Sequence, residues 1–256
     1  KIFFIKIHYI IINLKHKISI MFKTLLKVFF SLLILISCSN NSVNKLSMSD
    51  FGKAPNGEVV KKFKLTNSNG LSMEVINYGA IITNLNVPDS SGSLKDVVLG
   101  FNDFNNYYEN NPYFGAIIGR YGNRISNGTF LLDGVRYELE QNNGTNSLHG
   151  GLVGFDKVFW KFIEEKSSNQ SLYFEYYSKD MEEGFPGNLV VGVEYILNDS
   201  NELKIKYTAS TDKKTIINLT QHSYFNLSGE SSGDILDHIL NIDAEYYLPV
   251  NENMIP

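Results

Sequence analysis

Short runs of alternating apolar and polar residues recur along the chain from about Gly57 onward. This alternation is typical of β-strands with one buried face, and it is clear in residues 71–75, 193–195 and 203–207. Residues 130–132 and 135–137 flank Asp133-Gly134, a dipeptide that favours a tight hairpin turn. No long segment after residue 37 has helical periodicity. The pattern therefore predicts an all-β domain, arranged as a large antiparallel β-sandwich.

One segment departs from this pattern. Residues 105–112 (NNYYENNP) are too polar and too rich in turn-forming residues for a core strand. We predict a surface loop there, with Tyr107 and Tyr108 either packed inward or lining a pocket.

The N-terminal region has the features of a bacterial export signal. Residues 21–27 form a short basic start at Met21, and residues 28–36 are an apolar run too short to span a bilayer. The run ends in Leu35-Ile36-Ser37-Cys38, which resembles the lipobox of bacterial lipoproteins. This predicts a signal peptide at 21–37, lipidation of Cys38 and a location in the cell envelope, at the periplasm or outer membrane. An uncleaved anchor, or a buried cysteine without this role, is the alternative.

The remaining boundaries follow from this assignment. Residues 1–20 contain no Met and are interpreted as upstream sequence rather than structure. Residues 38–56 are polar and predict a flexible tether, so the folded domain is expected at 57–256.

Charge and cysteine content exclude several functions. Residues 1–37 hold six lysines and no acidic residue, so the rest of the chain carries 17 basic and 27 acidic residues and a net charge of −10. An acidic domain without a basic stripe argues against binding of nucleic acid. A single cysteine allows no intrachain disulfide, and the histidine spacing does not match a zinc site.

Four segments use glycine, asparagine and histidine where a plain β core would use valine and leucine. Each alone is a weak signal, because a histidine in a β protein is more often structural than catalytic. His238 has no such neighbours, and we expect it to be structural or exposed. The segments are residues 119–125 (GRYGNRI), 146–151 (NSLHGG, followed by GFDKVFW at 154–160), 183–188 (EGFPGN) and 218–227 (NLTQHSYFNL).

Together, and in this order, the four segments resemble the aldose 1-epimerase (galactose mutarotase) family. The resemblance continues into YYLPVNENMIP at residues 246–256 and covers about Gly57 to Pro256. It implies a galactose mutarotase-like β-supersandwich. It also implies interconversion of the α and β anomers of free aldoses such as glucose and galactose, without a cofactor or a metal.

The resemblance also assigns roles to residues. His222 matches the family's general acid, and histidine suits that task because it gives and recovers a proton near neutral pH. His149 matches a second catalytic position, while Arg124 and its neighbour Asn123 are expected to bind the sugar. Phe185 or Trp160 supplies a flat face for the sugar or belongs to the core.

One family feature has no match in this sequence. The general base of the family is a glutamate downstream of the QHSYFN motif, and we assign this role to none of Glu230, Glu245 and Glu252. The resemblance therefore predicts a domain that is incomplete at its C-terminus and inactive as given. Two alternative functions remain at this point: a non-catalytic sugar-binding lipoprotein, and a hexose-phosphate epimerase, which would need additional cationic groups.

Overall fold

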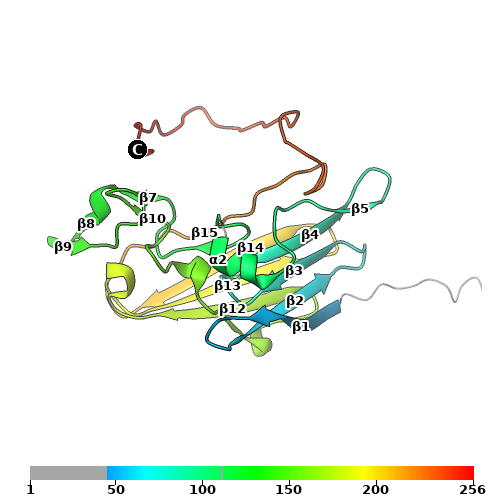
Figure 1. Cartoon of the computed structure of the whole chain (residues 1–256), viewed down its shortest axis with the longest axis horizontal. Helices are drawn as coiled ribbons and strands as arrows, with labels where there is room; N and C mark the ends of the chain where they lie inside the picture. The colour runs from blue at the N-terminus through cyan, green and yellow to red at the C-terminus, as the bar shows by residue number, and fades with distance from the viewer. Residues whose placement is uncertain (1–44, 111) are drawn as a thin grey trace, which may run out of the picture. The chain divides into compact units, whose positions relative to one another are not determined.

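The computed structural model describes residues 45–110 and 112–256, and Cys38 with the predicted signal peptide lies outside them. Two antiparallel sheets dominate the described residues (Figure 1). The first follows chain order and consists of β1 (Lys45–Lys53), β2 (Val59–Thr66), β3 (Ser72–Ile76), β4 (Ile82–Pro88) and β5 (Leu94–Asp96). The second consists of β11 (Lys161–Phe162), β12 (Ser171–Ser178), β13 (Leu189–Leu197) and β14 (Leu203–Thr211). The predicted antiparallel β fold is confirmed.

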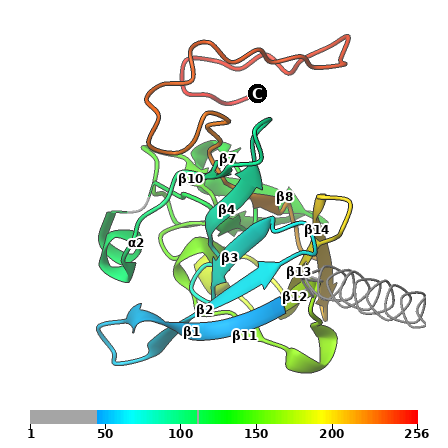
Figure 2. The same cartoon turned by 90° about the vertical axis from the view of Figure 1, so that its right-hand side faces the viewer.

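The two sheets pack against each other through a shared apolar core (Figure 2). Phe63 of β2 meets Phe174 of β12 edge to face, with ring centroids 5.2 Å apart. Along β13 every second residue from Leu189 to Leu197 is buried in this core. Burial of each such large side chain contributes about 1.5–3 kcal/mol. The alternation in the sequence thus becomes the inner face of a sandwich.

Strand β1 corrects the prediction of a tether at 38–56. Residues 45–53 pair with the whole of β2, from Lys45 opposite Thr66 to Lys53 opposite Val59. The strand lies at the edge of its sheet and exposes most of its side chains, so backbone pairing rather than apolar alternation holds it in place. The folded domain therefore begins before Gly57.

A short helix, α2 (Phe104–Asn110), corrects the surface loop predicted at 105–112. Asp103 begins it, because its carboxylate accepts the backbone N–H of Asn106 at 3.1 Å. Phe104 and Tyr107 lie three residues apart and are both buried, and Phe104 packs on Tyr78 with ring centroids 5.1 Å apart. Tyr107 thus packs inward, whereas Tyr108 is exposed.

Several short elements connect the two large sheets. The Asp133-Gly134 hairpin is confirmed: both residues have positive φ, as a type I′ turn requires, between β8 and β9. The short strand pairs are β6 (Ile117–Ile118) with β15 (Thr220–Gln221), β7 (Arg124–Ile125) with β10 (Ser147–Leu148), and β8 (Thr129–Leu132) with β9 (Val135–Glu138). The 3₁₀ turns are η1 (Ser126–Gly128), η2 (Phe155–Lys157), η3 (Glu164–Lys166) and η4 (Glu182–Gly184). Within the described residues, none of the helices has the length and hydropathy needed to span a bilayer.

Candidate active site

His222 is placed by the pairing of β15 with β6. It directly follows β15, and its backbone N–H donates to the carbonyl of Ala116 at 2.9 Å. The preceding residue, Gln221, fixes the backbone on either side. Its amide donates to the Gly115 carbonyl at 2.9 Å and its side-chain oxygen accepts the N–H of Ser223 at 2.9 Å. These bonds hold the histidine at the end of a very short strand.

His149 is placed in the same way by the pairing of β10 with β7. It follows β10 and exchanges two hydrogen bonds with Asn123. The backbone N–H of His149 donates to the Asn123 carbonyl at 3.0 Å, and the ring Nδ1 accepts the N–H of Asn123 at 2.9 Å. Because Nδ1 accepts this bond, the single proton of the neutral ring lies on Nε2. His149 therefore presents an N–H donor on its outer side.

The two histidines lie together. Their ring centroids are 5.2 Å apart and their planes are nearly perpendicular. Tyr113 contacts both, with its ring centroid 4.7 Å from that of His149 and 5.6 Å from that of His222. Tyr224 packs on His222, with ring centroids 5.1 Å apart. Two imidazoles this close can act on neighbouring atoms of one small substrate.

Burial is the main cause of the altered protonation of His149. Burial, together with the smaller effects of the nearby His222 and Arg124, lowers the pKa of His149 to about 4. His149 is therefore neutral at physiological pH. In this form it donates a hydrogen bond through Nε2 rather than carrying charge.

Arg124 and Asn123 complete the group predicted from the sequence. The Arg124 guanidinium donates from Nε to the side-chain oxygen of Asn143 at 2.8 Å and from Nη1 to that of Asn123 at 3.3 Å. The structure thus brings together all four predicted residues: His149 and His222 as a pair, Asn123 bonded to His149, and Arg124 bonded to Asn123.

A polar groove of about 320 Å³ opens beside Arg124. Its size falls in the range of small-ligand pockets. Amide side chains in its wall are suited to hydroxyl groups, since they both donate and accept hydrogen bonds. The lining residues are Arg124, Asn143, Gly144, Thr145, Asn146, Glu252, Asn253 and Met254.

Three other residues considered from the sequence have structural contacts. Trp160 and Phe185 are each 1% exposed, so both belong to the core and neither presents a face to a sugar. Trp160 donates its indole N–H to the Phe155 carbonyl at 3.0 Å. His238 accepts the backbone N–H of Leu227 at 3.0 Å and so holds its own loop. Among the residues described, no three His, Cys, Asp or Glu side chains are grouped as metal ligands.

Sequence reasoning missed Tyr113 and the groups behind the histidines. Tyr113 has a positive φ of 67°, which is unusual for an aromatic residue, but its PYFG context carries no local signal of a site. Arg120 lies in the same sequence segment as Arg124, and it is buried. It donates to the carbonyls of Pro186 and Gly187 at 2.8 and 2.9 Å and to the Ser178 hydroxyl at 2.6 Å.

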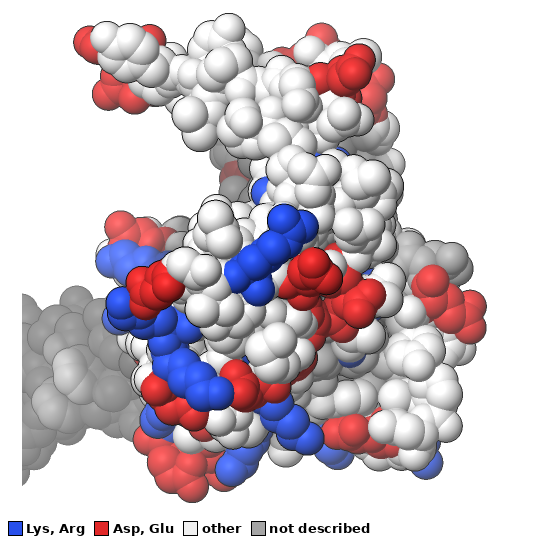
Figure 3. Space-filling view, turned by 90° about the vertical axis from the view of Figure 1, so that its left-hand side faces the viewer, with Lys and Arg blue, Asp and Glu red and all other residues white. Residues whose placement is uncertain are grey.

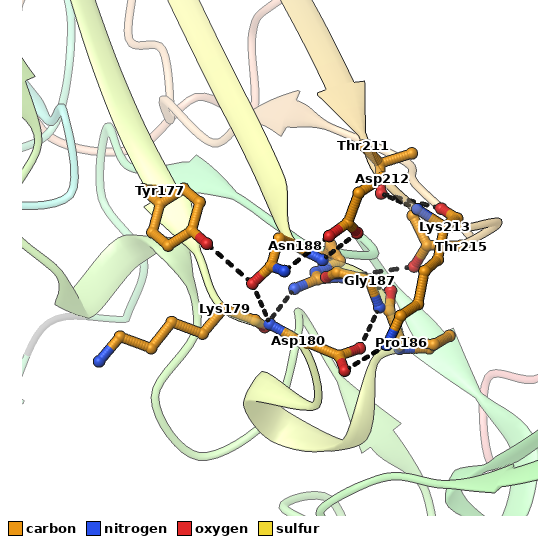
Figure 4. Close-up of polar contacts among 11 residues, drawn as sticks. Tyr177, Lys179, Asp180, Pro186, Gly187, Asn188, Thr211, Asp212, Lys213 and Thr215 are labelled. Atoms are coloured by element: carbon orange, nitrogen blue, oxygen red, sulfur yellow. Dashed lines mark hydrogen bonds and ion pairs between the residues drawn. The ribbon is translucent and has the colours of Figure 1, made fainter.

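The segment held by Arg120 is also tied to the second sheet (Figure 4). Asn188 is central: its side-chain oxygen accepts from the Tyr177 hydroxyl and the Asp180 N–H, and its amide donates to Asp212 at 2.7 Å. Asp180 also pairs with Lys213 at 2.6 Å. The segment 183–188 singled out from the sequence is therefore fixed to Arg120 and to the second sheet by hydrogen bonds.

Fold and site together define a β-sandwich protein with a histidine pair and, at the neighbouring Arg124, a polar groove lined by amides. The family model of aldose 1-epimerase matches residues 61–256. The chain is 47% identical over 212 residues to galactose mutarotase of Sus scrofa, covering 82% of this chain and 60% of that protein. It is 39% identical over 203 residues to aldose 1-epimerase of Escherichia coli, covering 79% and 58%. The chain belongs to the aldose 1-epimerase family.

Solved structures agree with this assignment. An aldose epimerase homologue from C. elegans superimposes with a TM-score of 0.62 at 33% identity, covering 65% of this chain and 50% of that one. A galactose 1-epimerase from Lactobacillus acidophilus gives a TM-score of 0.63 at 27% identity, covering 72% and 53%. The chain spans about 60% of the length of the curated relatives that it matches.

Proposed function

We propose that the protein interconverts the α and β anomers of free aldoses such as glucose and galactose. The observation that carries this proposal is the contact between His149 and His222, with ring centroids 5.2 Å apart. The family's relatives are named for this activity. Anomer exchange needs an acid at the ring oxygen and hydrogen-bond donors to the neighbouring sugar oxygens, and two adjacent imidazoles can fill these two roles.

His222 is proposed as the acid that protonates the ring oxygen. A base removes the proton of the C1 hydroxyl, the C1–O5 bond breaks, and its electron pair is captured at O5 by the proton from histidine. Rotation of the aldehyde about C1–C2 and closure on the other face return the proton to His222. No proton is gained or lost over the cycle, so no cofactor is required.

His149, Arg124 and Asn123 are proposed to bind the sugar. The neutral His149 ring offers its Nε2–H to a sugar oxygen, because Nδ1 is already occupied by the Asn123 N–H. Arg124 carries a fixed positive charge that stabilises the negative charge developing on oxygen during ring opening. The role of the base is assigned to none of these residues.

The activity is tested by polarimetry on the full-length protein. Freshly dissolved α-glucose or α-galactose should relax to its anomeric equilibrium faster with the protein than in buffer alone. Binding of sugar by calorimetry without any acceleration would instead support the sugar-binding alternative. Neither binding nor acceleration with any aldose would contradict both.

We further propose that Cys38 is acylated and anchors the protein in the cell envelope. The support is the basic start at Met21, the apolar run and the Leu35-Ile36-Ser37-Cys38 element. The enzyme would then act on sugars outside the cytoplasm. A labelled fatty acid should mark the protein expressed in bacteria, and Cys38→Ser should abolish the label. Labelling that survives this substitution would contradict lipidation at this residue.

A further inference from the structure

Glu183 lies behind the turn that follows His149 and bonds to its backbone. One carboxylate oxygen accepts the N–H of Leu152 at 2.7 Å, and the other accepts the N–H of Val153 at 3.1 Å. We propose that Glu183 is a positioning residue, which holds this turn so that the His149 ring stays in the geometry needed for proton chemistry. The inference rests on the proposed function and deepens it.

The turn is in a conformation that needs support. His149, Gly150 and Gly151 all have positive φ, of 56°, 95° and 113°. A Cβ on Gly151 would lie 2.1 Å from a carboxylate oxygen of Glu183, so only glycine allows the carboxylate this close. The two glycines adopt positive φ readily, but His149 does so at a cost and needs surrounding contacts to hold it.

Two side chains hold the backbone of the turn. Asn142 closes it across His149: its amide donates to the carbonyls of Leu148 and Gly151 at 2.9 and 2.7 Å, and its oxygen accepts the Leu148 N–H at 2.7 Å. Glu183 adds two bonds immediately beyond Gly151, at Leu152 and Val153. Loss of Glu183 therefore leaves the part of the turn after Gly151 without its carboxylate support.

Glu183 is itself on a rigid support. It has a positive φ of 51° and is followed by Gly184, whose Cβ position would lie 2.2 Å from the Glu138 carbonyl. Beyond it, buried Arg120 binds the carbonyls of Pro186 and Gly187. A carboxylate on such a support keeps its place, whereas one on a mobile loop would not.

The test is Glu183→Gln in the full-length protein. Glutamine keeps the shape and one acceptor oxygen, but its amide group faces the second N–H and cannot accept it. We expect kcat for α-galactose mutarotation to fall about tenfold, since catalysis is sensitive to small misplacement, while KM changes by less than about threefold.

A second readout does not depend on activity. NMR titration of the His149 ring should show its pKa rise from about 4 toward the ordinary value, because a released ring is less buried. Loss of the negative charge alone would lower this pKa, so the direction separates positioning from electrostatics. The titration also decides the role of Glu183 if the proposed function fails.

Glu182→Gln is the matched control. This neighbouring carboxylate accepts the Tyr176 hydroxyl at 2.7 Å and the Lys179 N–H at 3.0 Å, on a different segment from the turn. The control should leave both kcat and the His149 titration as in wild type. An unchanged titration and kcat in Glu183→Gln, or equal changes in both variants, would overturn the proposal.

Discussion

Asp156 is a buried carboxyl close to the histidine pair, and it is only 4% exposed. Burial raises its pKa to about 6, the charge of Glu183 acts in the same direction, and Lys157 acts against both. Asp156 in turn raises the pKa of Tyr113, which packs on both histidines, although burial of Tyr113 is the larger cause. The charge of this carboxyl thus acts on Tyr113, the tyrosine between the two histidines.

Asp156 and His149 should affect stability in opposite directions over the same pH range. The raised pKa of Asp156 means that the folded state binds its proton more tightly. The contribution of Asp156 to the stability of the fold is full below its ordinary pKa of 3.8 and is lost as the pH rises to about 6. The lowered pKa of His149 gives a contribution that is full above 6.5 and is lost as pH falls to about 4.

We predict that Asp156→Asn separates the two effects. At neutral pH the buried carboxyl of Asp156 is ionised, which destabilises the folded state. The neutral amide of asparagine avoids this cost, so the free energy of unfolding at neutral pH should increase by up to ~3 kcal/mol. Below pH 6.5 the variant should lose stability more steeply than wild type, because the opposing effect of Asp156 is gone. Urea unfolding across this range measures both. A variant with the wild-type pH profile would contradict the burial of a titrating carboxyl.

At the scale of elements, the turn after β10 depends on Gly150. A Cβ there would lie 1.9 Å from the Gly119 carbonyl, and φ is 95°. Gly144 also has positive φ, 62°, but nothing lies within 4 Å of its Cβ position. Substitution of Gly144 therefore tests backbone strain alone, whereas substitution of Gly150 tests strain together with collision against a neighbouring segment.

We predict that Gly150→Ala destabilises the protein more than Gly144→Ala. Gly144→Ala should cost about 1 kcal/mol for the positive φ alone. Gly150→Ala should cost at least ~2 kcal/mol more, because overlap with fixed backbone adds to the strain. Denaturant unfolding gives the comparison, and equal losses would show that the turn moves away from Gly119 at little cost.

Elements with a local signal were predictable from the sequence, and others were not. Alternation identified β3, β13 and β14, and Asp133-Gly134 identified the hairpin of β8 and β9. Strand β1 gave no such signal because it is an exposed edge strand. Helix α2 was missed because it is two turns long and depends on packing of Phe104 against Tyr78.

The site shows the same division. The strand pairs that precede His149 and His222 are short, with two residues in each strand. The strands β6 and β15 are also about a hundred residues apart in the sequence. No periodicity exists over two residues, so only the family resemblance placed the two histidines in one site. Tyr113 and Glu183 act through contacts made by the folded chain, and no local pattern reveals them.

At the scale of the whole molecule, the charge pattern suits a neutral substrate. Acidic and basic side chains are interspersed on the face in Figure 3. Many lysines are paired with carboxylates, such as Lys62 and Lys64 with Glu74 at 2.8 and 3.1 Å. A hexose phosphate would favour several free cations around the site. Arg124 already bonds to Asn143 and Asn123, and this supports the proposed free aldose over a sugar phosphate.

The most direct test of the proposed function is the rate of anomer exchange in the full-length protein with His222→Ala. Polarimetric relaxation of fresh α-galactose should slow by about 10²–10⁴-fold, because the proton donor to the ring oxygen is lost. Sugar affinity should be largely retained through His149 and Arg124, and the control His238→Ala should behave as wild type. Near-wild-type rates in His222→Ala would contradict the assignment of His222 as the acid.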